Sequence, residues 1–251
     1  MGKVMRAALE CGVVAMFAAS CLMVALRPDA VRNATVAPHS TLLEDLAYWG
    51  TQTPLRAEDD LVGIVQNPPN IALQSLLAAV LVACVVYIAL RARVRFAPPV
   101  PAAALLGLTA GAIWPWLGTT RPEAGLAVAA LAPVAIVGGM LYERRPPGTM
   151  NWALGLIAGW LTISGIGAAA ALVFMRLDVE SELVTLAALL ALSLIGAQVQ
   201  LSLGRNVAYA IAIIWAMLGI AAASMSLSMT VSTACVLGIA TMAVVVVRVT
   251  T

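Results

Sequence analysis

Long uninterrupted runs of apolar residues, separated by short polar segments, fill almost the whole chain. Each run stays apolar for about twenty residues, enough at about 1.5 Å per residue for an α-helix to cross the roughly 30 Å hydrocarbon layer of a membrane. Strands of a membrane β-barrel would alternate in polarity over about ten residues. The pattern therefore predicts an all-α, polytopic membrane bundle of about eight transmembrane helices. The predicted spans are residues 8–26, 71–90, 99–118, 124–142, 151–175, 183–203, 207–224 and 229–247.

The charged residues between these spans alternate in sign from one connection to the next, which predicts an orientation. Lys and Arg are retained on the cytoplasmic side of a membrane, while acidic loops cross freely. An even number of spans places both termini on one side, so both are predicted to be cytoplasmic. The basic residues of that side are Lys3, Arg6, Arg91, Arg93, Arg95, Arg144, Arg145, Arg205 and Arg248, whereas ten of the twelve acidic residues fall on the opposite side.

The composition indicates a protein embedded in a lipid bilayer and argues against binding of nucleic acid. The chain is 62% hydrophobic and 10% charged, far from the soluble averages of about 45–50% and 25%. A net charge of +2 spread over short loops gives no basic face for nucleic acid. The four cysteines form no CxxC motif and the single histidine, His39, lies in a loop, so no metal site is predicted.

The segment 27–70 is the one long connection, and it is predicted to be an outside, periplasmic loop of a single membrane domain covering residues 1–251. Within it, residues 41–49 have apolar positions at helical spacing behind a polar cap, which predicts a short interfacial helix. The first apolar run follows Lys3 and Arg6 and lacks a small-x-small cleavage site, so it is expected to be a retained helix rather than a cleaved signal.

The positions of the carboxylates argue against catalysis and against ion transport. Every Asp and Glu except Glu10 falls in a loop or at a span end, and Glu10 is about one turn inside the first span. Ion-coupled carriers and hydrolytic enzymes need ionisable groups or metal ligands at membrane depth. We therefore expect no catalytic residues and a protein that is not an enzyme.

Small residues recur at four-residue spacing in three spans, which predicts close helix–helix contacts. They are Gly107 and Gly111, Gly155 and Gly159, and Ala208, Ala212 and Ala216.

The tryptophans are the distinctive buried candidates. Trp160 and Trp215 fall well inside the apolar layer, where an indole N–H requires a partner such as Ser164, Thr162 or a bound ligand. Trp114, Trp116 and Trp152 fit an interfacial aromatic belt instead.

Two spans resemble a known family. Gly159-Trp160-Leu161-Thr162 resembles the Gly-Trp-Leu-Thr helix of the longer bacterial tryptophan-rich sensory proteins, relatives of the TspO/MBR family. In the seventh span, Tyr209-Ala210, Trp215-Ala216 and Gly219-Ile220 resemble their Tyr-Ala-x-x-x-x-Trp-Ala-x-x-Gly-Ile helix. The resemblance covers mainly residues 99–247.

The resemblance implies a multi-pass protein of the bacterial inner membrane that binds a flat apolar ligand such as a tetrapyrrole or another pigment, in a sensory, regulatory or transport role. The ligand-binding residues it implies are Trp160, Thr162, Tyr209 and Trp215, with Trp114 and Trp116 as further candidates. The second span departs from the family, because Tyr87 is its only aromatic residue. This departure motivates the alternative, an accessory structural subunit of a larger respiratory or photosynthetic membrane complex, or a homo-oligomer.

Overall fold

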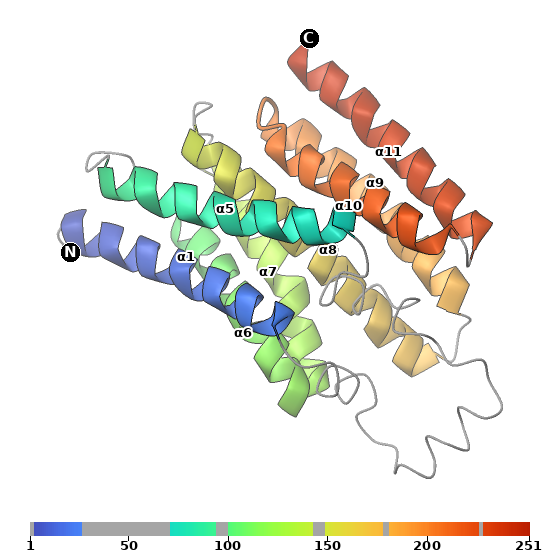
Figure 1. Cartoon of the computed structure of the whole chain (residues 1–251), viewed down its shortest axis with the longest axis horizontal. Coiled ribbons are helices and arrows are strands. Elements are labelled where there is room, and N and C mark those ends of the chain that lie inside the picture. The colour runs from blue at the N-terminus through green and yellow to red at the C-terminus, as the bar shows by residue number, and fades with distance from the viewer. Residues whose placement is uncertain (1–2, 27–70, 94–99, 143–148, 178–180, 226–227) are drawn as a thin grey trace.

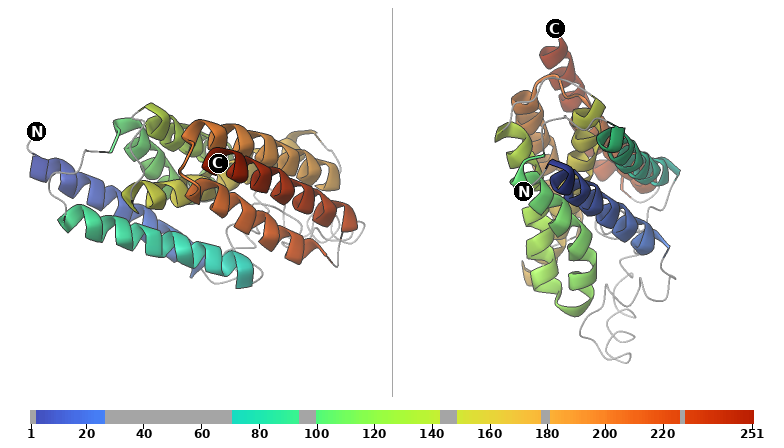
Figure 2. Two further views of the ribbon diagram at one scale, coloured as in Figure 1. Left: turned by 90° about the horizontal axis from the view of Figure 1, so that it is seen from above. Right: turned by 90° about the vertical axis from the view of Figure 1, so that its left-hand side faces the viewer.

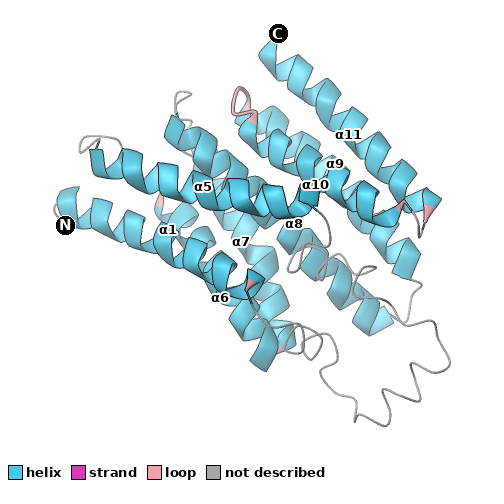
Figure 3. Cartoon of the chain, viewed as in Figure 1, coloured by secondary structure: helices cyan, strands magenta, loops and turns pink. Residues whose placement is uncertain are grey.

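The computed structural model describes residues 3–26, 71–93, 100–142, 149–177, 181–225 and 228–251, and all their regular structure is α-helical (Figures 1 and 3). The predicted all-α fold is confirmed for these residues, whereas the expected loop 27–70, its helix at 41–49 and His39 lie outside them. Eight helices account for the described chain: α1 (Lys3–Ala25), α5 (Ile71–Arg93), α6 (Ala102–Thr120), α7 (Pro122–Tyr142), α8 (Thr149–Leu177), α9 (Ser181–Leu203), α10 (Ala208–Ser224) and α11 (Met229–Thr250).

Six of these helices are long and apolar enough to cross a membrane, so the chain is a multi-pass membrane protein in its described part. The apolar segments of the other two are shorter, Ala102–Leu117 in α6 and Ala208–Ser224 in α10. Each predicted span coincides with one helix. The widest difference is at α1, which begins at Lys3 rather than residue 8, because Lys and Arg are good helix formers that extend a helix beyond its apolar run.

Two predicted turns have local chemistry that explains them. Pro122 begins α7, where its missing N–H is one that a helix would leave unpaired anyway. α10 ends at Ser224 and α11 begins at Met229, so the break expected near residues 225–229 is confirmed. There the side chain of Ser228 caps α11 by accepting a hydrogen bond from the Val231 N–H at 3.2 Å.

Consecutive helices run in opposite directions, and both ends of the chain lie towards the same end of the bundle (Figure 1). α1 lies beside α5 on one flank and α11 lies on the opposite flank, in Figure 1 and in the two views of Figure 2. α8 is central: it packs against α5, α7, α9 and α10. Two thirds of its apolar segment is buried, against one third or less in the other five long helices.

The predicted small-residue contacts are confirmed at the closest helix pairs. A Cβ added to Gly107 of α6 would lie 2.6 Å from the Ile136 nitrogen of α7, so the two backbones touch there. A Cβ on Gly159 of α8 would lie 2.6 Å from the Ala212 Cβ of α10. Glycine and alanine let helices approach until dispersion forces between their backbones hold them together. α6 and α7 make the most extensive contact of the bundle and are the antiparallel neighbours that their tight connection predicts.

Candidate functional site

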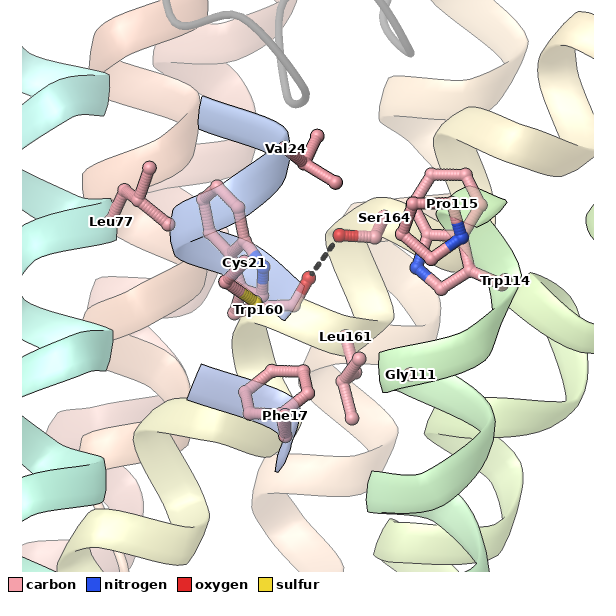
Figure 4. A pocket seen from close by; sticks show the side chains of 10 residues that line it. All are labelled: Phe17, Cys21, Val24, Leu77, Gly111, Trp114, Pro115, Trp160, Leu161 and Ser164. Atoms are coloured by element: carbon pink, nitrogen blue, oxygen red, sulfur yellow. Dashed lines mark hydrogen bonds between the residues drawn. The ribbon is translucent and has the colours of Figure 1, made fainter. Parts of the chain in front are cut away.

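A cavity of about 30 Å³ lies between α1, α6 and α8, with α5 at its edge (Figure 4). Both Trp114 and Trp160 contribute to its wall, so two of the predicted ligand-binding residues are brought together. The other lining residues that matter below are Phe17, Cys21, Leu161 and Ser164. In the view of Figure 4, Ser164 lies between the side chains of Trp160 and Trp114.

The local sequence explains how these side chains reach one cavity. Trp160 and Ser164 are four residues apart, so they share a face of α8. On α6, Pro115 interrupts the helix ladder, because it has no N–H to donate to the carbonyl of Gly111 one turn earlier. Gly111 itself has no side chain to fill the space, where a Cβ would lie 2.7 Å from Leu161 Cδ2.

Of the polar groups that line the cavity, one makes a hydrogen bond within the described part of the protein and two do not. The Ser164 hydroxyl, one of the indole partners that the sequence offered, donates instead to the backbone oxygen of Trp160 at 2.9 Å. No hydrogen bond joins the indole N–H of Trp114 or of Trp160 to another described residue, and neither nitrogen is a fully buried atom without a partner. A bound molecule with an acceptor atom would satisfy these donors.

The size of the cavity limits what it holds in this conformation. A volume of about 30 Å³ exceeds the roughly 10–15 Å³ that one water requires. Pockets for drug-sized ligands measure about 300–1,000 Å³. A tetrapyrrole therefore does not fit between these helices unless one of them moves.

Thr162 and Tyr209 lie together but away from the cavity. The Tyr209 hydroxyl donates to Thr162 Oγ1 at 3.3 Å, which joins α10 to α8, and both side chains are buried. Thr162 is two residues beyond Trp160, and residues at that spacing point to different sides of a helix. The four residues named first by the family resemblance therefore do not form one pocket in this conformation.

Trp116, Trp152 and Trp215 do not line the cavity. Trp215 is partly buried on α10 and packs against the main core, and it does not line the cavity. Trp116 is 39% exposed and Trp152 is 43% exposed, and their place in an aromatic belt stays a prediction. Trp114 is only 7% exposed, because it packs against Leu126 and Ala129 of α7 and Ala168 of α8, so it is not a surface residue as a belt tryptophan would be.

The structure contains a buried ionic cluster that the sequence did not predict. It lies between α1 and α5, at the end of the bundle that is predicted to face the cytoplasm. Glu10 is fully buried and accepts a hydrogen bond from Arg91 Nε at 2.7 Å and another from the Val100 N–H at 3.1 Å. The Tyr87 hydroxyl lies 3.5 Å from the same carboxylate and Arg6 Nε lies 3.8 Å from it. The cluster joins α1 to α5 and to the start of α6.

The sequence did hold a signal for this cluster. Glu10 is the one carboxylate inside a span, and an ionisable residue at membrane depth has a partner or a function by default. Tyr87 and Arg91 are four residues apart and therefore share the face of α5 that meets it. The apolar run of the second span ends near residue 90, which predicts a loop position for Arg91, whereas α5 continues to Arg93.

A second polar contact holds α1 beside the cavity. The Ser20 hydroxyl donates to the backbone oxygen of Ala112 on α6 at 2.6 Å and accepts a hydrogen bond from Trp116 Nε1 at 2.8 Å. Ser20 precedes the cavity residue Cys21. Hydrogen bonds between helices in membranes average about 0.6 kcal/mol, whereas removing one partner of a buried ion pair costs about 3–5 kcal/mol.

Among the residues that the structure describes, no group of three or more His, Cys, Asp or Glu side chains is placed to hold a metal ion. The four cysteines are free thiols, and Cys84 and Cys235 are buried as packing residues. Comparison of the chain with protein-family models, with curated proteins and with solved structures finds no match.

Proposed function

We propose that this chain is a non-enzymatic membrane protein that binds a flat apolar ligand against Trp114 and Trp160. The observation that carries the proposal is the convergence of two indoles from different helices on one cavity, with both indole N–H groups lacking a partner in the described chain. The resemblance of the fifth and seventh spans to tryptophan-rich sensory proteins supports a tetrapyrrole as the ligand class and a sensory, regulatory or transport role.

A fluorescence titration tests this proposal. We expect purified protein in detergent to show saturable quenching of tryptophan emission by protoporphyrin IX, because the porphyrin ring would stack on Trp160 and Trp114. The Trp160→Phe and Trp114→Phe variants are expected to bind about tenfold more weakly, since each loses indole surface and an N–H donor.

The matched control is Trp215→Phe, which removes an indole from α10 outside the cavity. This variant should retain the wild-type dissociation constant. Quenching that does not saturate, or an equal loss of affinity in all three variants, contradicts the cavity as the binding site.

A second candidate function, the accessory subunit of a larger membrane complex, is favoured by the small volume of the cavity. A cavity with room for little more than a water suits a scaffold role better than it suits a large ligand. Extraction from the native membrane in a mild detergent, followed by light scattering, separates the two functions. A particle larger than this chain with its detergent supports the scaffold or a homo-oligomer, whereas a monomer rejects both.

We further propose that α6 and α10 also cross the bilayer, which gives eight crossings with both termini in the cytoplasm of a bacterial inner membrane. The alternation of charge along the chain supports this orientation. Single cysteines replacing Arg93 and Arg205, in a chain freed of its own cysteines, are expected to react with an impermeant maleimide only after the cells are opened. A cysteine replacing Arg121 should react with intact spheroplasts, and labelling of Arg93→Cys there contradicts the topology.

A further inference from the structure

We infer that α1 is a hinged lid over the cavity, with the Glu10–Arg91 ion pair as its pivot and the Ser20 hydroxyl as its latch. The purpose of the lid rests on the proposed ligand site, whereas its motion can be measured without any ligand. Opening of such a lid would let a flat ring ligand enter a cavity that measures about 30 Å³ in this conformation.

The position of α1 suits it to move. About a fifth of its apolar segment is buried, the smallest share among the six long apolar helices. It packs on α5 and α6 at one flank of the bundle (Figures 1 and 2). Its side chains Phe17, Cys21 and Val24 form one wall of the cavity. A displacement of this part of α1 would open the cavity and leave the contacts between α8 and α10 intact.

The two polar contacts of α1 differ in strength, and the difference sets the direction of the motion. At Glu10 a buried carboxylate is held by the Arg91 guanidinium at 2.7 Å and by a backbone N–H at 3.1 Å. At Ser20 the contacts are two hydrogen bonds between neutral groups. Separating opposite charges in a low-dielectric interior costs far more than breaking neutral hydrogen bonds. The Ser20 end therefore opens first.

The spacing of the two contacts gives the lid a lever arm. Ser20 is ten residues beyond Glu10, which is about 15 Å along a helix. The buried side chain of Val14 lies near the pivot, whereas Cys21 lies at the cavity next to the latch. A small rotation about Glu10 thus moves Cys21 much further than Val14.

Cys21 is a natural reporter for opening. In a protein with Cys11, Cys84 and Cys235 replaced by alanine, the rate of Cys21 modification by a small methanethiosulfonate reagent reports access of water to the cavity. We expect Ser20→Ala to raise this rate about three- to tenfold, because it removes both hydrogen bonds of the latch. Trp116→Phe removes one of them and should raise the rate to a smaller extent.

A second reporter cysteine, placed near Glu10, distinguishes rotation of α1 about a hinge from detachment of the whole helix. Val14→Cys, placed in a chain without the native cysteines, should react at the same rate whether or not the Ser20→Ala substitution is also present. Ser202→Ala is the matched control, because Ser202 is exposed and its hydroxyl donates to the backbone oxygen of Gln198 on its own helix. It should change neither rate.

The outcomes are distinct. Faster modification of Cys21 alone supports the hinged lid. An equal acceleration at both reporters, or none at Cys21 in folded Ser20→Ala protein, overturns it. Protoporphyrin IX is then added to the wild-type reporter protein: a change in the Cys21 rate supports the ligand site, and an unchanged rate counts against the proposed function without affecting the lid.

Discussion

Replacement of Glu10 by leucine is expected to lower the free energy of unfolding by about 3–5 kcal/mol, because it leaves a buried charge without its partner. The substitution leaves the Arg91 guanidinium, which is 4% exposed, in the bundle without its carboxylate partner. It also removes the acceptor of the Val100 N–H at the start of α6. Equilibrium unfolding in mixed micelles of dodecyl maltoside and SDS measures the change.

Two controls identify the ion pair as the cause. The double variant Glu10→Leu with Arg91→Met should recover most of the lost stability, since apolar residues of similar volume replace a buried pair at little cost. Glu123→Leu breaks the ion pair with Arg176 at the other end of the bundle, where both side chains are largely exposed, and should change stability by less than about 1 kcal/mol. Equal effects of Glu10→Leu and Glu123→Leu would contradict a buried cluster.

The second large effect is expected at the contact of α6 with α7. In Gly139→Ala the new Cβ would lie 2.7 Å from the backbone nitrogen of Ala104, which cannot move unless α6 moves. We expect a loss of about 1–3 kcal/mol, the usual cost of overpacking a tight interface. The same micelle titration measures it.

The adjacent residue provides a matched control. Around Gly138 no atom of another described helix lies within 4 Å of an added Cβ, so Gly138→Ala adds a methyl group to open space in the described part of the bundle. It should leave stability unchanged or raise it by up to about 1 kcal/mol, because alanine favours a helix more than glycine does. A loss of stability in both variants, or in neither, would show that α6 and α7 are not in backbone contact.

Much of the fold could be predicted from the sequence, because the membrane imposes simple rules on it. Apolar length placed the helices, and short connections such as residues 118–123 made α6 and α7 neighbours. The sequence contains no comparable rule for which distant helices touch. The contact of α1 with α5 and α6, across the long connection 27–70, therefore emerged only from the structure.

The ligand-binding role of the candidate residues stays a prediction, whereas their placement can be compared with the structure. Trp114 and Trp160 line one cavity, but Thr162 does not, and helical geometry alone could have excluded it because it is two residues from Trp160. The pairing of Glu10 with Arg91 could not be derived, because it depends on the rotation of α1 and α5 about their axes. Apolar periodicity does not fix that rotation when helices are apolar on every side.

The central place of α8 has a consequence for how the chain is made. A membrane protein is inserted from its N-terminus as it leaves the ribosome, and residues 149–177 follow the first four described helices. α6 and α7 can pair as soon as both are synthesised, whereas α5 and α7 each lack a main packing partner until α8 emerges. Chains that stop before residue 149 should consequently be degraded by quality-control proteases, and those that stop after residue 177 should persist longer.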